Sequence, residues 1–128
     1  YVEPVLACSG LDSVPVTAVR ARVPADGEAD IQYDYPEAEA RCNAAWAVCK
    51  CNPMTRALAE GREVIFVGDG LRSDACAARE ATTVFARGRL LEYCRADGIE
   101  ARPFEDFRVI ADYIRAARTE PENGQRDQ

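Results

Sequence analysis

The sequence predicts an α/β fold, in which a parallel sheet is flanked by helices and preceded by a β-hairpin or flap. From residue 64 onward, apolar or β-branched segments of strand length alternate with segments of helical pattern. Such alternation is typical of a parallel sheet with right-handed crossovers. Further upstream, two extended segments at 14–23 and 29–35 flank the turn-forming residues "PADGE". This arrangement predicts an antiparallel hairpin.

The second half opens with the strand 64–67. Its letters "VIFV" form a continuous apolar run, which is typical of a strand buried on both faces. In the helix 105–118, the side chains of Phe107, Ile110, Ala111 and Ile114 recur with helical spacing on one face. The other elements expected in this half are the helices 73–81 and 89–98, the latter closed by Gly98, and the strands 82–87 and 99–104.

The first half carries different patterns. Residues 1–7 have the spacing of an apolar-faced helix, and 36–50 are expected to be helical or looped. Asn52 is the expected N-cap of a helix over 53–60, with Pro53 at its first position and Gly61 as its stop. We therefore expect one domain over 1–118, with a hairpin or flap at 14–35 and a core of αβ units at 50–118. A flexible polar tail is expected at 119–128.

Composition limits the class of protein. The 128 residues suffice for one domain, and 48% of them are hydrophobic, enough for a packed core. The formal net charge is −6, and Lys50 is the single lysine, so non-specific binding to nucleic acid is not expected. No apolar run approaches the ~20 residues that cross a bilayer, and no signal-peptide pattern leads the chain, so a cytoplasmic location is expected. The oligomeric state is left open.

Six cysteines are present, but the chain has no histidine. Without a secretory signal, we expect reduced thiols rather than disulfides. The grouping of Cys42, Cys49 and Cys51 lacks C-x-x-C spacing, so a zinc site is not favoured.

The candidate site combines one lysine with two acids. If the helix 53–60 runs antiparallel to the strand that follows it, its start lies at the carboxyl end of that strand, so Lys50 and Asp69 can meet. This edge is where open α/β sheets bind ligands. There Asp69 and Asp74 would hold Mg²⁺ directly or through its water, and Lys50 would neutralise phosphoryl oxygens. Alternatively, Gly-Asp-Gly is an ordinary turn and Asp74 merely caps its helix.

Other readings are weaker. "GDGLRS" resembles a dinucleotide-binding loop, but Ser73 replaces its third glycine, and Arg87 stands where a ribose-binding acid is expected. Arg87 and Arg89 could meet a phosphate or simply begin a solvated helix. Trp46, Tyr33 and Tyr35 could line a substrate pocket, although packing within the hairpin or cap is favoured.

Several stretches carry a family resemblance. "VIFVGDGLRSDACAA", "VFARGRLLEYCRADGI" and "PFEDFRVIADYI", together with "YVEPVLA" and "AVCKCNPM", resemble the haloacid dehalogenase-like (HAD) hydrolases. The branch resembled contains phosphatases of 2-hydroxy-3-keto-5-methylthiopentenyl-1-phosphate, phosphoserine and phosphoethanolamine or phosphocholine. The resemblance implies the C-terminal portion of a Rossmann-like (HAD-like) domain, and a Mg²⁺-dependent phosphatase that hydrolyses a small phosphorylated metabolite through an aspartyl-phosphate.

Residue by residue, Lys50 matches the third-motif lysine, implying a catalytic and phosphate-binding role. Asp69 and Asp74 match the fourth-motif acids, with Asp69 as the direct Mg²⁺ ligand and a catalytic residue. Gly68 and Gly70 match the backbone that lets the loop approach the metal, and Gly70 would contact phosphate. The family's D-x-D motif, which carries the nucleophile, is not found in these 128 residues and is expected upstream. Four residues separate the two acids here, where this branch usually has three. The alternative is a degenerate, non-catalytic HAD-like domain acting as a structural or partner-binding module.

Overall fold

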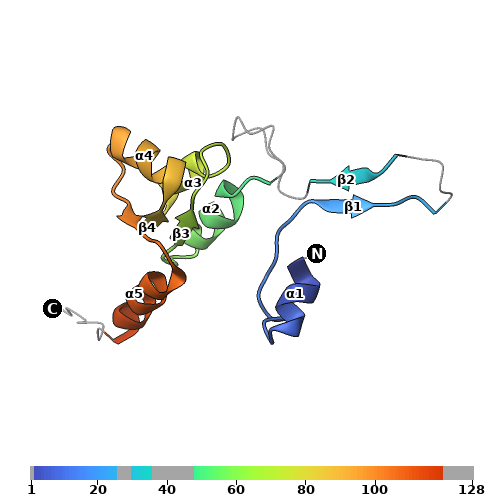
Figure 1. The fold of residues 1–128 in the computed structure, drawn as a ribbon, viewed down its shortest axis with the longest axis horizontal. Coiled ribbons are helices and arrows are strands. Elements are labelled where there is room, and N and C mark those ends of the chain that lie inside the picture. Colours follow the sequence, from blue (N-terminus) through green and yellow to red (C-terminus); the bar gives the residue numbers. More distant parts are fainter. Residues whose placement is uncertain (1, 26–29, 36–47, 120–128) are drawn as a thin grey trace.

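The computed structural model describes residues 2–25, 30–35 and 48–119 of the chain. It contains an α/β unit formed by the second half of the chain, and an N-terminal helix with a β-hairpin that lies to one side of that unit (Figure 1). Residues 36–47 of the expected segment 36–50, residues 120–128 of the expected tail 119–128 and the centre of the hairpin connection lie outside the described residues, as do Trp46 and Cys42.

The α/β unit is built on a three-stranded parallel sheet with the order β3–β4–β5. Strand β3 (Ile65–Gly68) pairs in parallel with β4 (Thr83–Ala86), and Gly68 lies opposite Ala86 at their carboxyl ends. Strand β5 (Arg102–Pro103) pairs only with the end of β4. It is shorter than the predicted strand 99–104, and Pro103 has no N–H to extend the ladder. The predicted α/β class and parallel sheet are confirmed.

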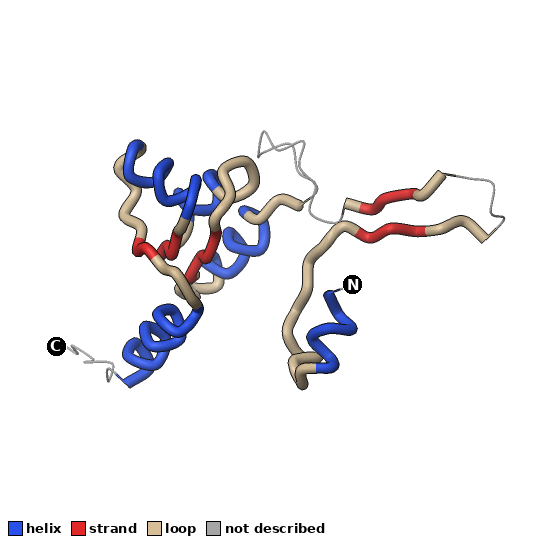
Figure 2. Tube along the Cα trace, in the orientation of Figure 1, coloured by secondary structure: helices blue, strands red, loops and turns tan. Residues whose placement is uncertain are grey.

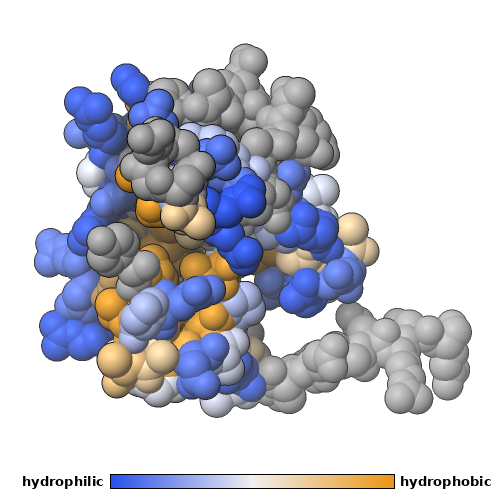
Figure 3. Space-filling model, turned by 90° about the vertical axis from the view of Figure 1, so that its right-hand side faces the viewer, coloured by the Kyte–Doolittle hydropathy of each residue, from blue (hydrophilic) through white to orange (hydrophobic). Residues whose placement is uncertain are grey.

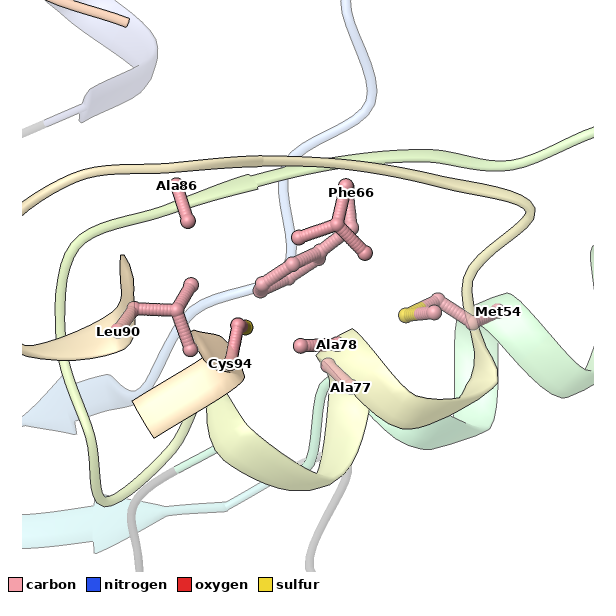
Figure 4. Packing of buried hydrophobic residues seen from close by; sticks show 8 residues of the cluster. Met54, Phe66, Ala77, Ala78, Ala86, Leu90 and Cys94 are labelled. Atoms are coloured by element: carbon pink, nitrogen blue, oxygen red, sulfur yellow. The ribbon is translucent and has the colours of Figure 1, made fainter. Parts of the chain in front are cut away.

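Helices cover the two faces of the sheet. Helices α2 (Cys51–Ala59), α3 (Ala75–Glu80) and α4 (Gly88–Ala96) pack on one face, and α5 (Phe107–Thr119) packs on the other (Figure 2). Alternate strand residues supply the two cores, as the pleat requires. In Figure 4 the ring of Phe66 points from the sheet toward the helices that carry Ala78 and Cys94. The core on the α2–α4 side consists of Met54, Phe66, Ala77, Ala78, Val84, Ala86, Leu90 and Cys94.

The opposite core is smaller and differs from the predicted face of α5. Ile110 is buried against Phe85 and Phe104, and Ile114 packs beside them. Phe107, predicted on the buried face, is 70% exposed. Tyr113 takes part instead, with its ring edge-on to Phe85 at 5.3 Å and its hydroxyl 3.2 Å from Thr83 Oγ1. A tyrosine can pack its ring and keep its hydroxyl hydrogen-bonded, which the apolar pattern alone does not indicate.

The helix that leads into β3 ends as predicted but begins differently. Gly61 has φ +75°, and the Arg62 N–H donates to Ala57 O at 3.0 Å, which is a glycine-closed C-terminus. The predicted N-cap, Asn52, is instead inside α2, which begins at Cys51 with Lys50 in the N-cap position and no side-chain cap. The helix therefore starts directly after the lysine, and this places Lys50 at the sheet edge.

The N-terminal part consists of α1 (Val2–Cys8) and an antiparallel hairpin of β1 (Arg20–Arg22) and β2 (Gln32–Asp34), which confirms the predicted hairpin. Its strands are largely exposed, and Arg22 pairs with Asp34 across them at 2.6 Å. Tyr33 and Tyr35 are 54% and 50% exposed, so neither is packed as expected. When the right-hand side of Figure 1 faces the viewer, hydrophobic residues are visible on the surface of the molecule (Figure 3).

Within the described part of the chain, no helix is both long enough and apolar enough to cross a membrane.

Candidate functional site

The carboxyl end of β3 leads into a loop that gathers charged residues far apart in the sequence. Asp69 and Gly70 follow the strand directly, and Asp74 precedes α3. From the start of α2, Lys50 Nζ donates a hydrogen bond to Asp74 Oδ1, although 24 positions separate the two residues. The predicted approach of the lysine to this loop is thus present, and its direct partner is Asp74.

Asp74 is the buried centre of the cluster. Its side chain is 4% exposed, whereas that of Lys50 is 41% exposed. Besides Lys50, Oδ1 accepts from Ser73 Oγ at 3.1 Å, and Oδ2 accepts from the main-chain N–H groups of Gly70 at 3.0 Å and Asp69 at 3.3 Å. Hydrogen bonds therefore reach both oxygens, which is what a buried carboxylate requires.

The alternative that Asp74 merely caps a helix does not fit this geometry. Asp74 occupies the N-cap position of α3, yet its side chain makes no capping hydrogen bond. The carboxylate turns back toward the loop and Lys50. The four-residue spacing between the two acids still lets the second carboxylate reach the N–H of the first acid.

The environment of Asp74 changes its proton affinity. Burial raises the pKa, but the hydrogen bond from Lys50, the Gly70 N–H and the charge of Lys50 lower it more, so the pKa lies below its ordinary value. A carboxyl whose pKa is lower in the folded than in the unfolded chain stabilises the fold above the unfolded pKa of about 3.9. That stabilisation is lost as the pH falls through the folded pKa.

We therefore expect the free energy of unfolding, measured by urea titration at a series of pH values, to fall as the pH drops below about 4. Asp74→Asn should remove part of this acid dependence. Asp106→Asn is the matched control. The pKa of Asp106 is also lowered, by Arg108, but in an exposed pair whose loss should change the slope little. Equal acid slopes for the wild type and Asp74→Asn would contradict the assignment.

Asp69 is exposed, whereas Asp74 is buried. Its side chain is 66% exposed, and Oδ2 lies 3.7 Å from Arg87 Nη2, at the carboxyl end of β4. Its main-chain carbonyl accepts from the Leu90 N–H at 3.3 Å, so the loop is tied to α4 while the carboxylate faces outward. Sequence reasoning placed Arg87 near a strand end without detecting this pairing.

The two glycines of the loop differ in the space around them. An added Cβ on Gly68 would lie 2.7 Å from Asp74 Oδ2 and 2.9 Å from Phe66 Cε1, so there is no room for one. On Gly70 the nearest atom would be Asp74 Oδ2 at 3.3 Å. Gly68 is thus required by packing against the buried carboxylate, which the sequence did not reveal.

A hard divalent cation prefers oxygen ligands and, in the case of Mg²⁺, keeps several waters. The exposed Asp69 carboxylate fits a direct ligand. The carboxylate of Asp74 is already engaged, and so fits a residue that orients the loop and the lysine. Within the described residues, no group of three or more His, Cys, Asp or Glu side chains is placed to hold a metal. The described residues therefore offer one direct protein ligand, the carboxylate of Asp69. Any further protein ligands would come from residues outside the described part of the chain.

The fold and the site at the sheet edge together define the structural class of the chain. It is an α/β unit with a lysine and two acids at the carboxyl end of its parallel strands. No family model matches the chain. Three curated proteins are similar to it, and each is named 2-hydroxy-3-keto-5-methylthiopentenyl-1-phosphate phosphatase. The protein of Exiguobacterium sibiricum is 31% identical over 85 residues, which is 66% of this chain and 38% of the relative. That of Bacillus pumilus is 31% identical over 81 residues, covering 62% and 35%.

The chain thus spans little more than a third of the length of the curated relatives it matches. These matches confirm the resemblance to the HAD-like hydrolases, in the branch that contains this phosphatase.

Proposed function

We propose that the chain carries the lysine-bearing and cation-binding part of a HAD-like phosphatase, a phosphoric monoester hydrolase dependent on Mg²⁺. The observation that supports this most is the contact between Lys50 and the buried Asp74, beside the exposed carboxylate of Asp69. This arrangement offers a positive charge for a phosphoryl group and a carboxylate for a cation at one sheet edge. The nucleophilic aspartate that forms the aspartyl-phosphate would be supplied by a segment outside these 128 residues.

Each residue has a separate task in this proposal. Lys50 is partly exposed, so its ammonium can donate to a phosphoryl oxygen while Asp74 holds it in place. Asp69 presents a ligand oxygen for the cation, and the Gly70 backbone lies where the phosphate would approach. When bound, Mg²⁺ would supply charge neutralisation to the transferring group. Asp74 fixes the position of the lysine and of the 69–70 backbone.

The substrate is proposed to be a small phosphorylated metabolite. The relatives' name gives the first compound to test, 2-hydroxy-3-keto-5-methylthiopentenyl-1-phosphate. A cytoplasmic location is also proposed, with the cysteines as reduced thiols.

Phosphate release tests the proposal. The complete protein with its upstream segment should release phosphate from this compound when Mg²⁺ is present, and chelation should abolish release. Lys50→Met should lower kcat by about a hundredfold or more, because a preorganised charge at the phosphoryl group is lost. Arg62→Gln is the matched control, since Arg62 pairs with the exposed Glu60 at the other end of α2 and should leave kcat unchanged.

The 128-residue chain alone should release little or no phosphate, because it lacks the D-x-D motif. Robust Mg²⁺-dependent release by this chain would contradict the proposed source of the nucleophile. Unchanged kcat in Lys50→Met would contradict the role of the lysine.

A second candidate is a non-catalytic HAD-like domain that binds a partner or has a structural role. The two differ in the upstream gene sequence. A D-x-D motif there supports the enzyme, and its absence from the complete gene supports the binding module.

A further inference from the structure

A second positively charged side chain, that of Arg87, lies at the same sheet edge as Asp69, and the pairing of the strands places it there. The parallel register sets Gly68 opposite Ala86, so the next residues, Asp69 and Arg87, follow the ends of neighbouring strands. The Arg87 N–H donates to Gly68 O at 3.2 Å, extending the ladder by one residue. The backbones of Asp69 and Arg87 are therefore fixed relative to each other.

The side chain of Arg87 is held from two sides. Its Nη2 lies 3.7 Å from Asp69 Oδ2, and its Cζ lies 5.4 Å from the centre of the Phe104 ring. Phe104 is 7% exposed and belongs to the core, so it offers the guanidinium a fixed surface on which to rest. The ion pair is long and half exposed on both partners, so it contributes little to stability.

Two of the described ion pairs lie at this edge, Lys50 with Asp74 and Arg87 with Asp69. A divalent cation that binds the exposed carboxylate must therefore do so beside a guanidinium. Like charges a few ångströms apart repel even in water, and the repulsion is strongest at low ionic strength.

We propose that Arg87 is the counter-ion of Asp69 and competes with a divalent cation for its carboxylate, which makes Arg87 a positioning residue that sets cation affinity. This inference rests on the proposed function, since it takes Asp69 to be the cation ligand. In the cation-free state the guanidinium holds the carboxylate at the edge. When the cation binds, the guanidinium remains on the ring of Phe104 and gives up its contact with Asp69.

The test is a calorimetric titration of the complete protein with MgCl₂ at low ionic strength, with the amide signals of residues 68–70 followed by NMR. Arg87→Gln should bind Mg²⁺ about three- to tenfold more tightly than the wild type, because one repelling charge is removed. Arg87→Lys keeps the charge but loses the guanidinium stacked on Phe104, so its affinity should lie between those of the wild type and Arg87→Gln. Arg89→Gln is the matched control, an exposed arginine two positions along whose described contacts do not include the two acids, and it should alter affinity less than about twofold.

Equal or weaker binding by Arg87→Gln, with clear binding by the wild type, would overturn the role of Arg87 and leave the cation site in place. Absence of binding in the wild type and all three variants would contradict the cation-binding part of the proposed function and, with it, this inference. Thermal unfolding of each variant, followed by circular dichroism, identifies any that fail to fold. If Arg87→Gln fails to fold, Arg87→Lys carries the test. A lysine that is not stacked on Phe104 repels the cation more weakly, so this variant should bind Mg²⁺ more tightly than the wild type.

Discussion

Asp74→Ala is expected to destabilise the α/β unit by about 2–4 kcal/mol. The substitution removes a buried carboxylate that accepts from Lys50, Ser73 and the N–H groups of Asp69 and Gly70. The main-chain donors lose their acceptor, and the turn between β3 and α3 loses the group around which it is built. Chemical denaturation, followed by far-UV circular dichroism, measures the change.

Asp69→Ala is the matched control for this prediction. It also replaces an aspartate of this loop by alanine. The side chain of Asp69, however, is exposed, and its ion pair with Arg87 is 3.7 Å long. Its effect on the free energy of unfolding should stay within about 0.5 kcal/mol, while cation binding should be lost. If both variants were equally stable, Asp74 would not be the structural centre of the loop.

Gly68→Ala is expected to cost about 1–3 kcal/mol, although alanine is an otherwise mild replacement. A Cβ at this position would lie 2.7 Å from Asp74 Oδ2, 2.9 Å from Phe66 Cε1 and 3.0 Å from Leu90 Cδ2. Phe66 and Leu90 are core residues, so they cannot move aside without opening the packing on the α2–α4 side. The carboxylate of Asp74 would shift as well, which disturbs its contact with Lys50.

Gly70→Ala provides the graded comparison, since its nearest contact would be 3.3 Å and involves only Asp74. Its cost should be clearly smaller. In thermal unfolding, Gly68→Ala should show the larger decrease in Tm, and a reversed order would contradict the packing argument.

The predictable part of this protein followed from periodicity and from the rules of sheet topology. The apolar run at 64–67 gave a parallel strand within one residue of its position, and Gly61 and Gly98 closed their helices with positive φ. The approach of Lys50 to the loop after β3 followed because a helix and the next strand run antiparallel. Sheet topology thus predicted that Lys50 reaches this loop without any knowledge of individual side-chain contacts.

What the sequence did not show depends on side-chain direction. The choice between Asp69 and Asp74 as the partner of Lys50 rests on which carboxylate turns inward, and no spacing rule fixes that. The hydroxyl of Ser73 and the pairing of Arg87 with Asp69 are likewise contacts between neighbouring turns and strands. Asn52 failed as an N-cap because α2 begins two residues earlier than predicted, at Cys51, with Lys50 in the N-cap position. Phe107 failed as a core residue: it is 70% exposed, and Ile110, Tyr113 and Ile114 supply the packed face of α5.

The central claim is that the edge beyond β3 binds a divalent cation through Asp69, next to the lysine held by Asp74. Paramagnetic broadening by Mn²⁺ in an NMR spectrum of the ¹⁵N-labelled protein tests this most directly, because it reports where the ion resides. We predict that the amide signals of residues 68–74 and 87–88 broaden first, and that Asp69→Asn abolishes the effect. Broadening centred elsewhere, for example on the Arg22–Asp34 hairpin, or unchanged in Asp69→Asn, would contradict it.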